Sequence, residues 1–262
     1  MTSPFDATAP SFDRDRALPN GVAETVRTAI LGAVASGGDA AARERPRLLD
    51  LGAGTGRIGW PFVAAGDDYV GVDLSYCMLR VFAGRCDHGH RAALVQADGC
   101  ALPFADAVFD AILLVQIFGG LQDWRRLVDE GRRVLRGDGA LVIGRTVTPG
   151  EGVDALMRQH LLTLLGRKLE RQNTREDAEC YLTSIASAAS HLVGPVWRAE
   201  RSPRAFLDRH ATAAPFSQLP QARREEVLRA LAAWAQTQFG DLDAMFPETH
   251  RFEMRVFRFS GE

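Results

Sequence analysis

Between residues 47 and 147, short apolar runs alternate with stretches that have helical periodicity. The runs read RLLDLG, YVGVD, ALVQ, DAILLV and ALVIG, and each has the length and composition of a buried β-strand. Strands that alternate with helices form a parallel sheet, because parallel neighbours need a crossover connection and a helix usually supplies it. This alternation predicts a doubly wound α/β fold with helices on both faces of a mostly parallel sheet.

The segments on either side of this core extend the fold. Before it, apolar residues recur every four positions from Val22 to Val34, which predicts one helix over 21–37. After it, the pattern is helical over about 151–192 and 203–245, with a strand near 195–202. The final stretch, 249–260, alternates apolar and charged residues, which indicates a half-exposed antiparallel strand near the sheet edge.

These assignments predict one domain of seven strands that spans residues 1–262. Its expected parts are an N-terminal arm and helix (1–45), a ligand-binding core (46–148), an inserted helical cap with one sheet strand (149–248), and a final strand (249–262). The cap lies between two strands of the same sheet, so we expect it to be an insertion and not an independent domain.

The first strand of the core is followed by a glycine loop. Gly52, Gly54 and Gly56 occupy alternate positions between this strand and the next helix, which places them at the carboxyl edge of the sheet, where open α/β folds bind ligands. The dinucleotide fingerprint GxGxxG requires its third glycine where Arg57 stands. Asp50 would repel a pyrophosphate at the helix N-terminus but would attract an amino group. The loop therefore favours an amine-bearing nucleoside over NAD.

Two further carboxylates follow the next strands. Asp73 ends the second strand of the core, at the distance from the glycine loop expected of a ribose-binding acid. Asp98 ends the third strand, where it can accept a hydrogen bond from an exocyclic amine. Taken alone, a glycine loop can be a tight turn and a strand-end Asp can be a helix cap. Three such features at consecutive strand ends favour a binding site.

The sequence resembles the class I S-adenosylmethionine-dependent methyltransferases. The segments that carry the resemblance are LLDLGAGTGRIGWPFVAAG, YVGVDLSYCMLRVF, QADGCALPFADAVFDAILLVQIFGGLQDW and DEGRRVLRGDGALVI. They are most similar to the small-molecule branch that includes the ubiquinone and menaquinone biosynthesis type. The resemblance covers about residues 12–147 and implies a Rossmann-like fold, with S-adenosylmethionine as cofactor.

The resemblance also implies a set of cofactor-binding residues, which are Arg16, Asp50, Gly52, Ala53, Gly54, Asp73, Leu74, Met78, Asp98, Gly99 and Gln116. In this set, Asp73 holds the ribose, Leu74 and Met78 enclose the adenine, and Asp98 binds the adenine edge. SFDRDRALP resembles the N-terminal segment of the family, an arm that often closes over the cofactor, and its Arg16 would neutralise the cofactor carboxylate.

Departures from the family pattern bear on the chemistry. Gly119 and Gly120 stand where many relatives carry a His-His pair, so that imidazole role is absent. No NPPY or DPPY motif follows the fourth strand of the core, which argues against methylation of amines on DNA bases. Methyl transfer needs mainly orientation and exclusion of water, and no catalytic residue is assigned from the sequence.

Composition bounds the partners and the compartment. Lys and Arg total 31 against 33 for Asp and Glu, a formal net charge of -2, so no electrostatic footprint for nucleic acid or an anionic membrane is present. The four cysteines lack zinc-ligand spacing, and the Cys86, His88 and His90 loop is expected to be a polar turn without metal. The acidic N-terminus does not resemble a signal peptide. We expect a soluble cytoplasmic protein of undetermined oligomeric state.

The sequence thus predicts an enzyme that methylates an O, N or C atom of a small-molecule acceptor, with the helical cap selecting a partly hydrophobic acceptor. Two alternatives stay open at this point. One is a relative that uses the cofactor for non-methylating chemistry, such as a cyclase, and the other is a non-catalytic binding module.

Overall fold

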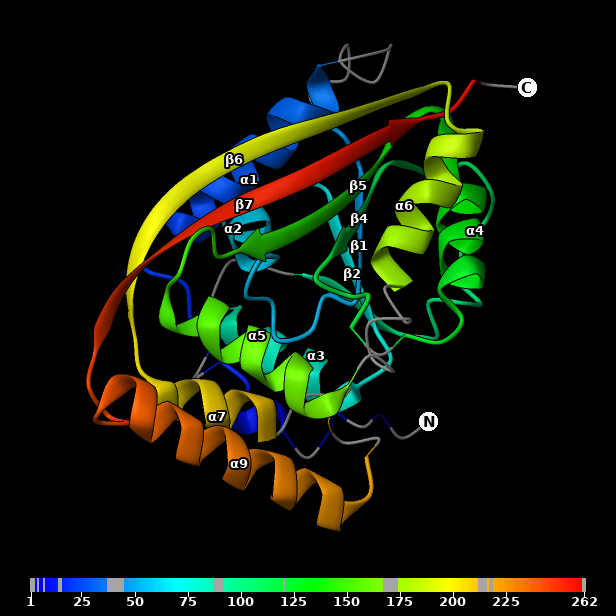
Figure 1. Cartoon of the computed structure of the whole chain (residues 1–262). Helices are drawn as coiled ribbons and strands as arrows, with labels where there is room; N and C mark the ends of the chain where they lie inside the picture. The colour runs from blue at the N-terminus through cyan, green and yellow to red at the C-terminus, as the bar shows by residue number, and fades with distance from the viewer. Residues whose placement is uncertain are drawn as a thin grey trace.

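The computed structural model describes residues 3, 5–6, 8–13, 16–36, 45–86, 92–119, 121–166, 174–211, 216 and 219–260. Within these residues one seven-stranded sheet has the order β3-β2-β1-β4-β5-β7-β6 (Figure 1). Its strands are β1 (Leu48–Leu51), β2 (Tyr69–Asp73), β3 (Ala93–Gln96), β4 (Phe109–Val115), β5 (Leu135–Val147), β6 (Ala188–Arg201) and β7 (Phe246–Arg258).

The direction of the strands agrees with the expected topology. Strands β1 to β5 pair in parallel, and β7 runs antiparallel to both β5 and β6. The doubly wound, mostly parallel sheet with an antiparallel last strand is therefore confirmed. The last strand in sequence lies between β5 and β6, so β6 forms the edge of the sheet. All seven residues of β4 are buried, as expected for a central strand that is covered on both faces.

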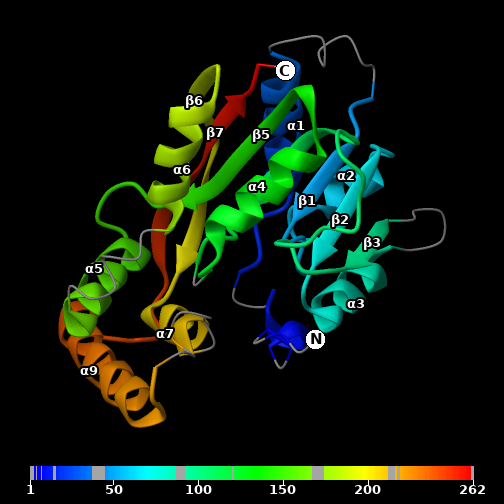
Figure 2. The same cartoon turned by 90° about the vertical axis from the view of Figure 1, so that its right-hand side faces the viewer.

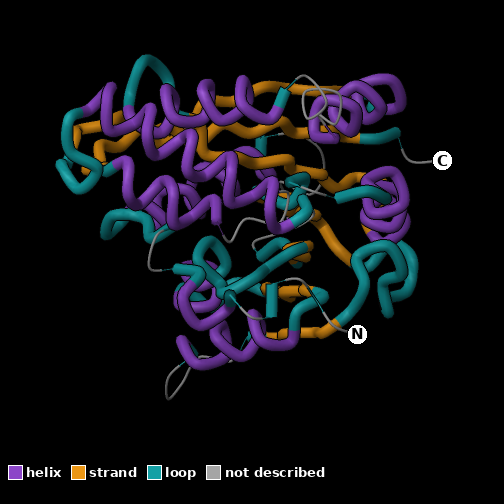
Figure 3. Tube along the Cα trace, turned by 60° about the horizontal axis from the view of Figure 1, so that its bottom comes forward, coloured by secondary structure: helices purple, strands orange, loops and turns teal. Residues whose placement is uncertain are grey.

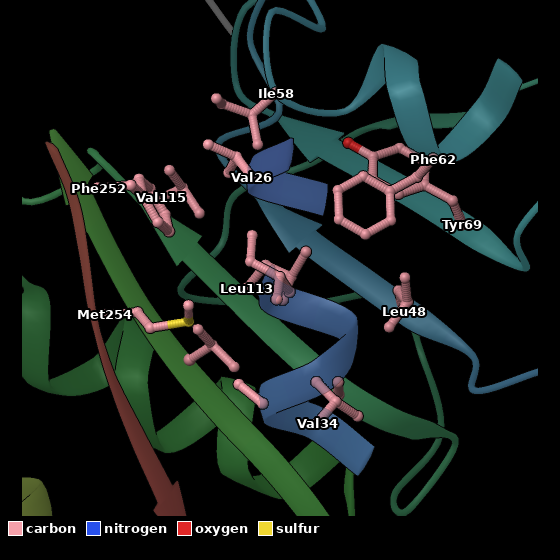
Figure 4. Packing of buried hydrophobic residues seen from close by; sticks show 14 of the residues in the cluster. Val26, Val34, Leu48, Ile58, Phe62, Tyr69, Leu113, Val115, Phe252 and Met254 are labelled. Atoms are coloured by element: carbon pink, nitrogen blue, oxygen red, sulfur yellow. The ribbon is translucent and has the colours of Figure 1, made fainter. Parts of the chain in front are cut away.

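Helices cover both faces of the sheet, as Figure 3 shows. One face carries α1 (Val22–Ala35), α2 (Trp60–Ala64) and α3 (Tyr76–Arg85), and the opposite face carries α4 (Trp124–Val134) and α6 (Thr174–Ile185). The apolar stripe predicted for the first helix is buried, with Val26 and Ile30 fully inaccessible. Figure 4 shows Val26 and Val34 of α1 against Leu48 and Leu113 of the sheet.

The remaining helices are α5 (Val153–Leu165), α7 (Pro203–Ala211) and α9 (Gln221–Phe239), and a short 3-10 turn covers Ala9–Ser11. These three helices share a hydrophobic cluster of their own. Strands β6 and β7 pair far beyond the end of β5, and the three helices lie at the end of this long hairpin (Figure 2). We call α5, α7 and α9 the cap.

The expected helical segment over 151–192 is wrong in its last residues. The chain forms α6 only to Ile185, and β6 begins at Ala188, seven residues before the expected strand. Alanines in IASAAS, residues 185–190, continue the helical apolar pattern of α6. The Ser187 N–H nevertheless donates to the Arg258 carbonyl (2.9 Å) and starts the pairing with β7. The helix gives way because the outer edge of β7 needs hydrogen-bond partners.

The assignment of α6 to the cap is also corrected by the structure. Ala178 and Leu182 of α6 are fully buried in the cluster formed by α4 and the sheet, so α6 covers a sheet face. The last strand begins at Phe246, three residues earlier than expected, because residues 246–248 pair with the end of β6. The cap proper is smaller than the predicted insertion.

A glycine substitution tests the packing of α2 against β2. A methyl group added at Gly59 would lie 2.1 Å from the Tyr69 hydroxyl and 3.0 Å from the Phe82 ring. We expect Gly59→Ala to lower the free energy of unfolding by about 1–3 kcal/mol, the usual result of overpacking a filled core, as measured by chemical denaturation. Gly32→Ala is the matched control, because nothing lies within 4 Å of its added methyl, and it should stabilise α1 by up to about 1 kcal/mol. Equal effects of the two changes would contradict the packing argument.

Candidate functional site

A cavity of about 390 Å³ opens at the carboxyl edge of the sheet. The glycine loop forms its floor, the residues that follow β2, β3 and β4 form its sides, and Phe5 and Phe12 of the N-terminal arm line it as well. The position is the one that open α/β sheets use for ligands.

The predicted site residues come together at this cavity. All except Arg16 line it, namely Asp50, Gly52, Ala53, Gly54, Asp73, Leu74, Met78, Asp98, Gly99 and Gln116. They were chosen at the ends of successive strands, and parallel strands bring their carboxyl ends to one edge. The geometry therefore places them where a single ligand could contact them.

The glycine loop has a backbone that other residues rarely adopt. Gly52, Gly54 and Gly56 have φ angles of 81°, 56° and 77°, in the left-handed region that favours glycine. A Cβ at Gly56 would lie 2.3 Å from the Phe82 ring, so this glycine is needed for packing. A Cβ at Gly54 would meet only the Gly52 carbonyl, at 3.8 Å, and would occupy the cavity instead. Gly54 thus leaves space for a ligand.

The Asp73 carboxylate fixes this loop to the end of β2. One oxygen accepts the Gly54 N–H (2.9 Å) and the other accepts the Ser75 N–H (2.8 Å). Burial raises the pKa of Asp73, and the two backbone hydrogen bonds oppose that rise. The carboxylate is therefore held rigidly at the wall of the cavity.

Asp50 lies deeper and is only 3% exposed. The Tyr69 hydroxyl donates to its Oδ2 (2.6 Å). Burial raises the pKa of Asp50 to about 6; the Tyr69 hydrogen bond lowers it and the charge of Asp73 raises it further. A buried carboxylate with one donor is suited to a second, positively charged partner.

Asp98 lies at the exposed rim of the cavity, where it closes a turn by accepting the Cys100 N–H (2.8 Å). Burial and the charge of Asp98 raise the pKa of the Cys100 thiol to about 11, so this thiol is protonated at neutral pH. Between these acids, the Ser75 hydroxyl accepts the Met78 N–H (3.1 Å) and caps α3. This hydrogen bond at the start of α3 positions Leu74 and Met78 beside Asp73.

Gln116 and Arg57 form one further wall. Gln116 follows β4 with a φ of 57°, unusual for a residue with a side chain, and its side-chain oxygen accepts a hydrogen bond from the Arg57 guanidinium. Burial lowers the pKa of Arg57 to about 10, which still leaves it charged at neutral pH. The sequence identified Arg57 only as a missing glycine; a long cation directly after the loop was the signal for its role in the wall.

Arg16 does not line the cavity. Its guanidinium lies over the Phe12 ring at 4.4 Å and donates to the Arg209 carbonyl of α7 (2.9 Å). Asp6 and Asp13 connect the same arm to the site: Asp6 accepts the Ser75 hydroxyl (2.6 Å), and Asp13 accepts the Thr55 hydroxyl (2.7 Å). The arm lies between α7 and α3 (Figure 2), and its carboxylates hold it over the glycine loop.

Other titratable residues considered from the sequence lie elsewhere. His160 stacks on Trp234, His210 stacks on Phe206, and Arg145 pairs with Glu253 (3.0 Å). Across the described ranges no three His, Cys, Asp or Glu residues are grouped as a metal site requires; His88 and His90 lie outside those ranges. Over the same ranges, every helix is too short or too polar to cross a bilayer.

The Tyr69–Asp50 hydrogen bond gives a pH-dependent stability prediction. The folded pKa of Asp50, about 6, lies above its ordinary value of 3.8, so its contribution to stability is complete below about pH 4 and is lost as the pH rises through 6. Tyr69→Phe removes a donor to the ionised form. We expect it to lower the free energy of unfolding by about 1.5–3 kcal/mol at pH 8 and by about 0.5–1.5 kcal/mol at pH 5.

The measurement is chemical denaturation at the two pH values. Tyr181→Phe is the control, because the Tyr181 hydroxyl donates to the exposed Asp129 carboxylate (2.8 Å), and its effect should stay within about 0.5 kcal/mol at both pH values. A Tyr69→Phe effect that is equal at pH 5 and pH 8 would show that the hydrogen bond does not depend on the charge of Asp50.

Comparison with known proteins identifies the family. The family model described as a methyltransferase domain matches residues 49–143. A demethylmenaquinone methyltransferase of Thermobifida fusca is 36% identical over 188 residues, which span 70% of this chain and 77% of that protein. One from Clavibacter sepedonicus is 35% identical over 150 residues, 57% of this chain and 59% of that protein.

The fold has the same relationship. The crystal structure of the YcgJ protein from Bacillus subtilis superposes with a TM-score of 0.54 at 20% identity and covers 84% of this chain and 94% of that one. The sequence match extends over the glycine loop, β2, β3 and β4, whose ends line the cavity, and into β5. The chain belongs to the class I S-adenosylmethionine-dependent methyltransferases.

Proposed function

We propose that this protein transfers the methyl group of S-adenosylmethionine to an O, N or C atom of a small-molecule acceptor. The observation that carries the proposal is the cavity itself. Three carboxylates at consecutive strand ends (Asp50, Asp73 and Asp98) surround a left-handed glycine loop whose Gly54 leaves the cavity open. A cofactor with an ammonium group, a sulfonium and a nucleoside matches this charge and shape.

Each wall of the cavity suits one part of the cofactor. Asp73 is placed to accept hydrogen bonds from the ribose hydroxyls, Leu74 and Met78 offer apolar surface to the adenine, and Asp98 at the rim suits the exocyclic amine. The deeper Asp50 suits the amino group of the methionine part. These are the roles that the family resemblance implies, and the presence of each side chain in the cavity wall supports them.

The carboxylate of the methionine part needs a cation. Arg57 lies in the cavity wall, whereas Arg16 is turned toward α7. We therefore propose that Arg57 binds the cofactor carboxylate and that Arg16 holds the arm against α7. Gln116 accepts a hydrogen bond from Arg57, and we assign it to the side of the cavity that faces both the cofactor and the acceptor.

The bound cofactor supplies an electrophilic methyl group. The residues of this chain supply orientation and exclusion of water, which is most of what a displacement at an unhindered carbon needs. Phe5 and Phe12 of the arm pack edge to face with ring centroids 6.2 Å apart and line the cavity, where their apolar rings would help to exclude water. The cap is the element available to select the acceptor.

The expected setting of the reaction belongs to the same proposal. All four cysteines are free, which fits a reducing cytoplasm, and a formal net charge of -2 does not favour nucleic acid as a partner. We also propose that the chain is a single domain: α7 and α9 of the cap are inserted between β6 and β7, and α5 comes from the connection between β5 and β6.

Substitution of Gly54 tests the cofactor site. Gly54→Val places a branched side chain in the cavity, and we expect at least a hundredfold loss of affinity for S-adenosylhomocysteine by calorimetry. Gly66→Val is the matched control, because Gly66 has a similar positive φ of 76° and nothing within 4 Å of an added Cβ. It carries the same backbone strain, about 1–2 kcal/mol, but should bind normally. Normal binding by Gly54→Val would exclude the loop as the cofactor site.

Turnover is tested with methyl-labelled S-adenosylmethionine and a panel of small phenols, amines, carboxylic acids and quinols. A demethylated naphthoquinol belongs in the panel, because two relatives are named demethylmenaquinone methyltransferases. Label in a product supports the proposal. Product without label indicates non-methylating chemistry, and tight binding of the cofactor without any turnover indicates a binding module.

A further inference from the structure

Three arginines lie between the cap and the carboxyl edge of the sheet, and they come from separate elements. Arg158 belongs to α5, Arg201 ends β6, and Arg209 belongs to α7. Two acids accompany them, Asp154 on α5 and Glu248 on β7. We call these five residues the cationic cluster, and the inference drawn from them rests on the proposed methyltransferase function.

Asp154 is the counter-ion of two of the three arginines. Its carboxylate pairs closely with Arg209 and lies 3.9 Å from the Nε atom of Arg201. One carboxylate therefore compensates two guanidinium groups, and its capacity for a third is small.

Glu248 adds little negative charge. It is 3% exposed, and its Oε1 accepts the Asp154 N–H (2.9 Å). Burial, followed by the charge of Asp154, raises the pKa of Glu248 to about 7. The raised pKa weakens the negative charge of Glu248 near neutral pH, and three arginines against two acids leave the cationic cluster with an excess of positive charge.

Arg158 is the arginine that this excess leaves without a carboxylate. It lies one helical turn after Asp154, and no ion pair within 4 Å joins it to any acid of the described chain. Its side chain is exposed. Desolvation lowers its pKa; the charge of Asp154 raises it, and the charges of Arg209 and Arg145 lower it. An exposed guanidinium without a paired carboxylate can take an anionic ligand.

Further donors face the same region. Trp197 and Arg201 are four residues apart on β6, so their side chains point to one face of the strand. The Trp197 Nε1 and Arg201 Nε atoms are buried, and neither has a hydrogen-bond acceptor among the residues that the structure describes. Buried donors without acceptors lower the stability of the folded chain, and an anion bound at the cationic cluster would reduce that loss.

The cationic cluster lies close to the cofactor cavity. The Arg57 guanidinium in the cavity wall donates to the Arg16 carbonyl (3.0 Å), and the Arg16 guanidinium donates to the Arg209 carbonyl (2.9 Å). Two hydrogen bonds therefore lead from the cavity to α7. A molecule bound at the cationic cluster is therefore near the proposed site of the methyl donor.

We propose that the methyl acceptor carries an oxyanion, either a carboxylate or a phosphate group, and that the cationic cluster binds it with Arg158 as the principal contact. A guanidinium presents paired N–H donors that match the two oxygens of such a group. The cap thereby selects anionic acceptors over neutral ones of the same shape.

The test uses calorimetry on the full chain loaded with S-adenosylhomocysteine, with three probes: benzoate, inorganic phosphate and the neutral benzamide. We expect benzoate or phosphate to bind at millimolar concentrations or below and benzamide not to bind. The probe that binds identifies the oxyanion as carboxylate or phosphate. Arg158→Gln should weaken its binding about tenfold or more.

Arg229→Gln is the matched control, because Arg229 is exposed on α9 and donates only to the Glu225 carbonyl of its own helix. Arg229→Gln should bind the probe as tightly as the unmodified chain does. Both variants should keep the melting temperature of the unmodified chain. Benzamide that binds as well as benzoate, no binding of either anion, or an unchanged affinity in Arg158→Gln would each overturn the inference. S-adenosylhomocysteine is titrated first, so a loss of cofactor binding is seen separately from a loss of anion binding at the cationic cluster.

Discussion

The functional site depends on one carboxylate, that of Asp73, which joins the glycine loop to the end of β2. It accepts the Gly54 and Ser75 N–H groups with different oxygens. Each carboxylate oxygen has lone pairs for a second donor, so Asp73 can order the loop and still accept ribose hydroxyls. The left-handed φ angles of the loop are then fixed before any ligand arrives, and the cavity next to Gly54 is preorganised. Preorganisation of this kind reduces the entropy lost on binding.

The core of the fold and the positions of the site residues could be predicted from the sequence because they depend on local patterns. Apolar runs of strand length fix β1 to β5, and a residue directly after such a run must lie at the carboxyl edge. Asp50, Asp73 and Asp98 were located in this way. Side-chain direction is not local, however: Arg16 lies in the expected arm but turns to α7, and Arg57 occupies the cavity wall instead.

The second half of the chain was harder to predict for a related reason. Residues 186–192 have a helical apolar pattern, but their structure is decided by β7, more than fifty residues later, whose outer edge they pair with. The pairing also extends both strands beyond β5 and so sets where the cap stands. No local sequence pattern predicts the length of the hairpin. The grouping of Arg158, Arg201 and Arg209 cannot be predicted from such a pattern either, because tertiary packing brings them together.

The distribution of charge connects the two halves of the proposed site. In the proposed arrangement, acids line the cofactor cavity and guanidinium groups form the cationic cluster under the cap, with Arg57 at their boundary. A cationic cofactor and an anionic acceptor would then be directed to different places, and neither would compete well for the place of the other. In a site from which the arm excludes water, their opposite charges would attract each other more strongly than in bulk solvent. The arm and the cap would then act together, and the hydrogen bond from Arg16 to Arg209 is one contact that joins them.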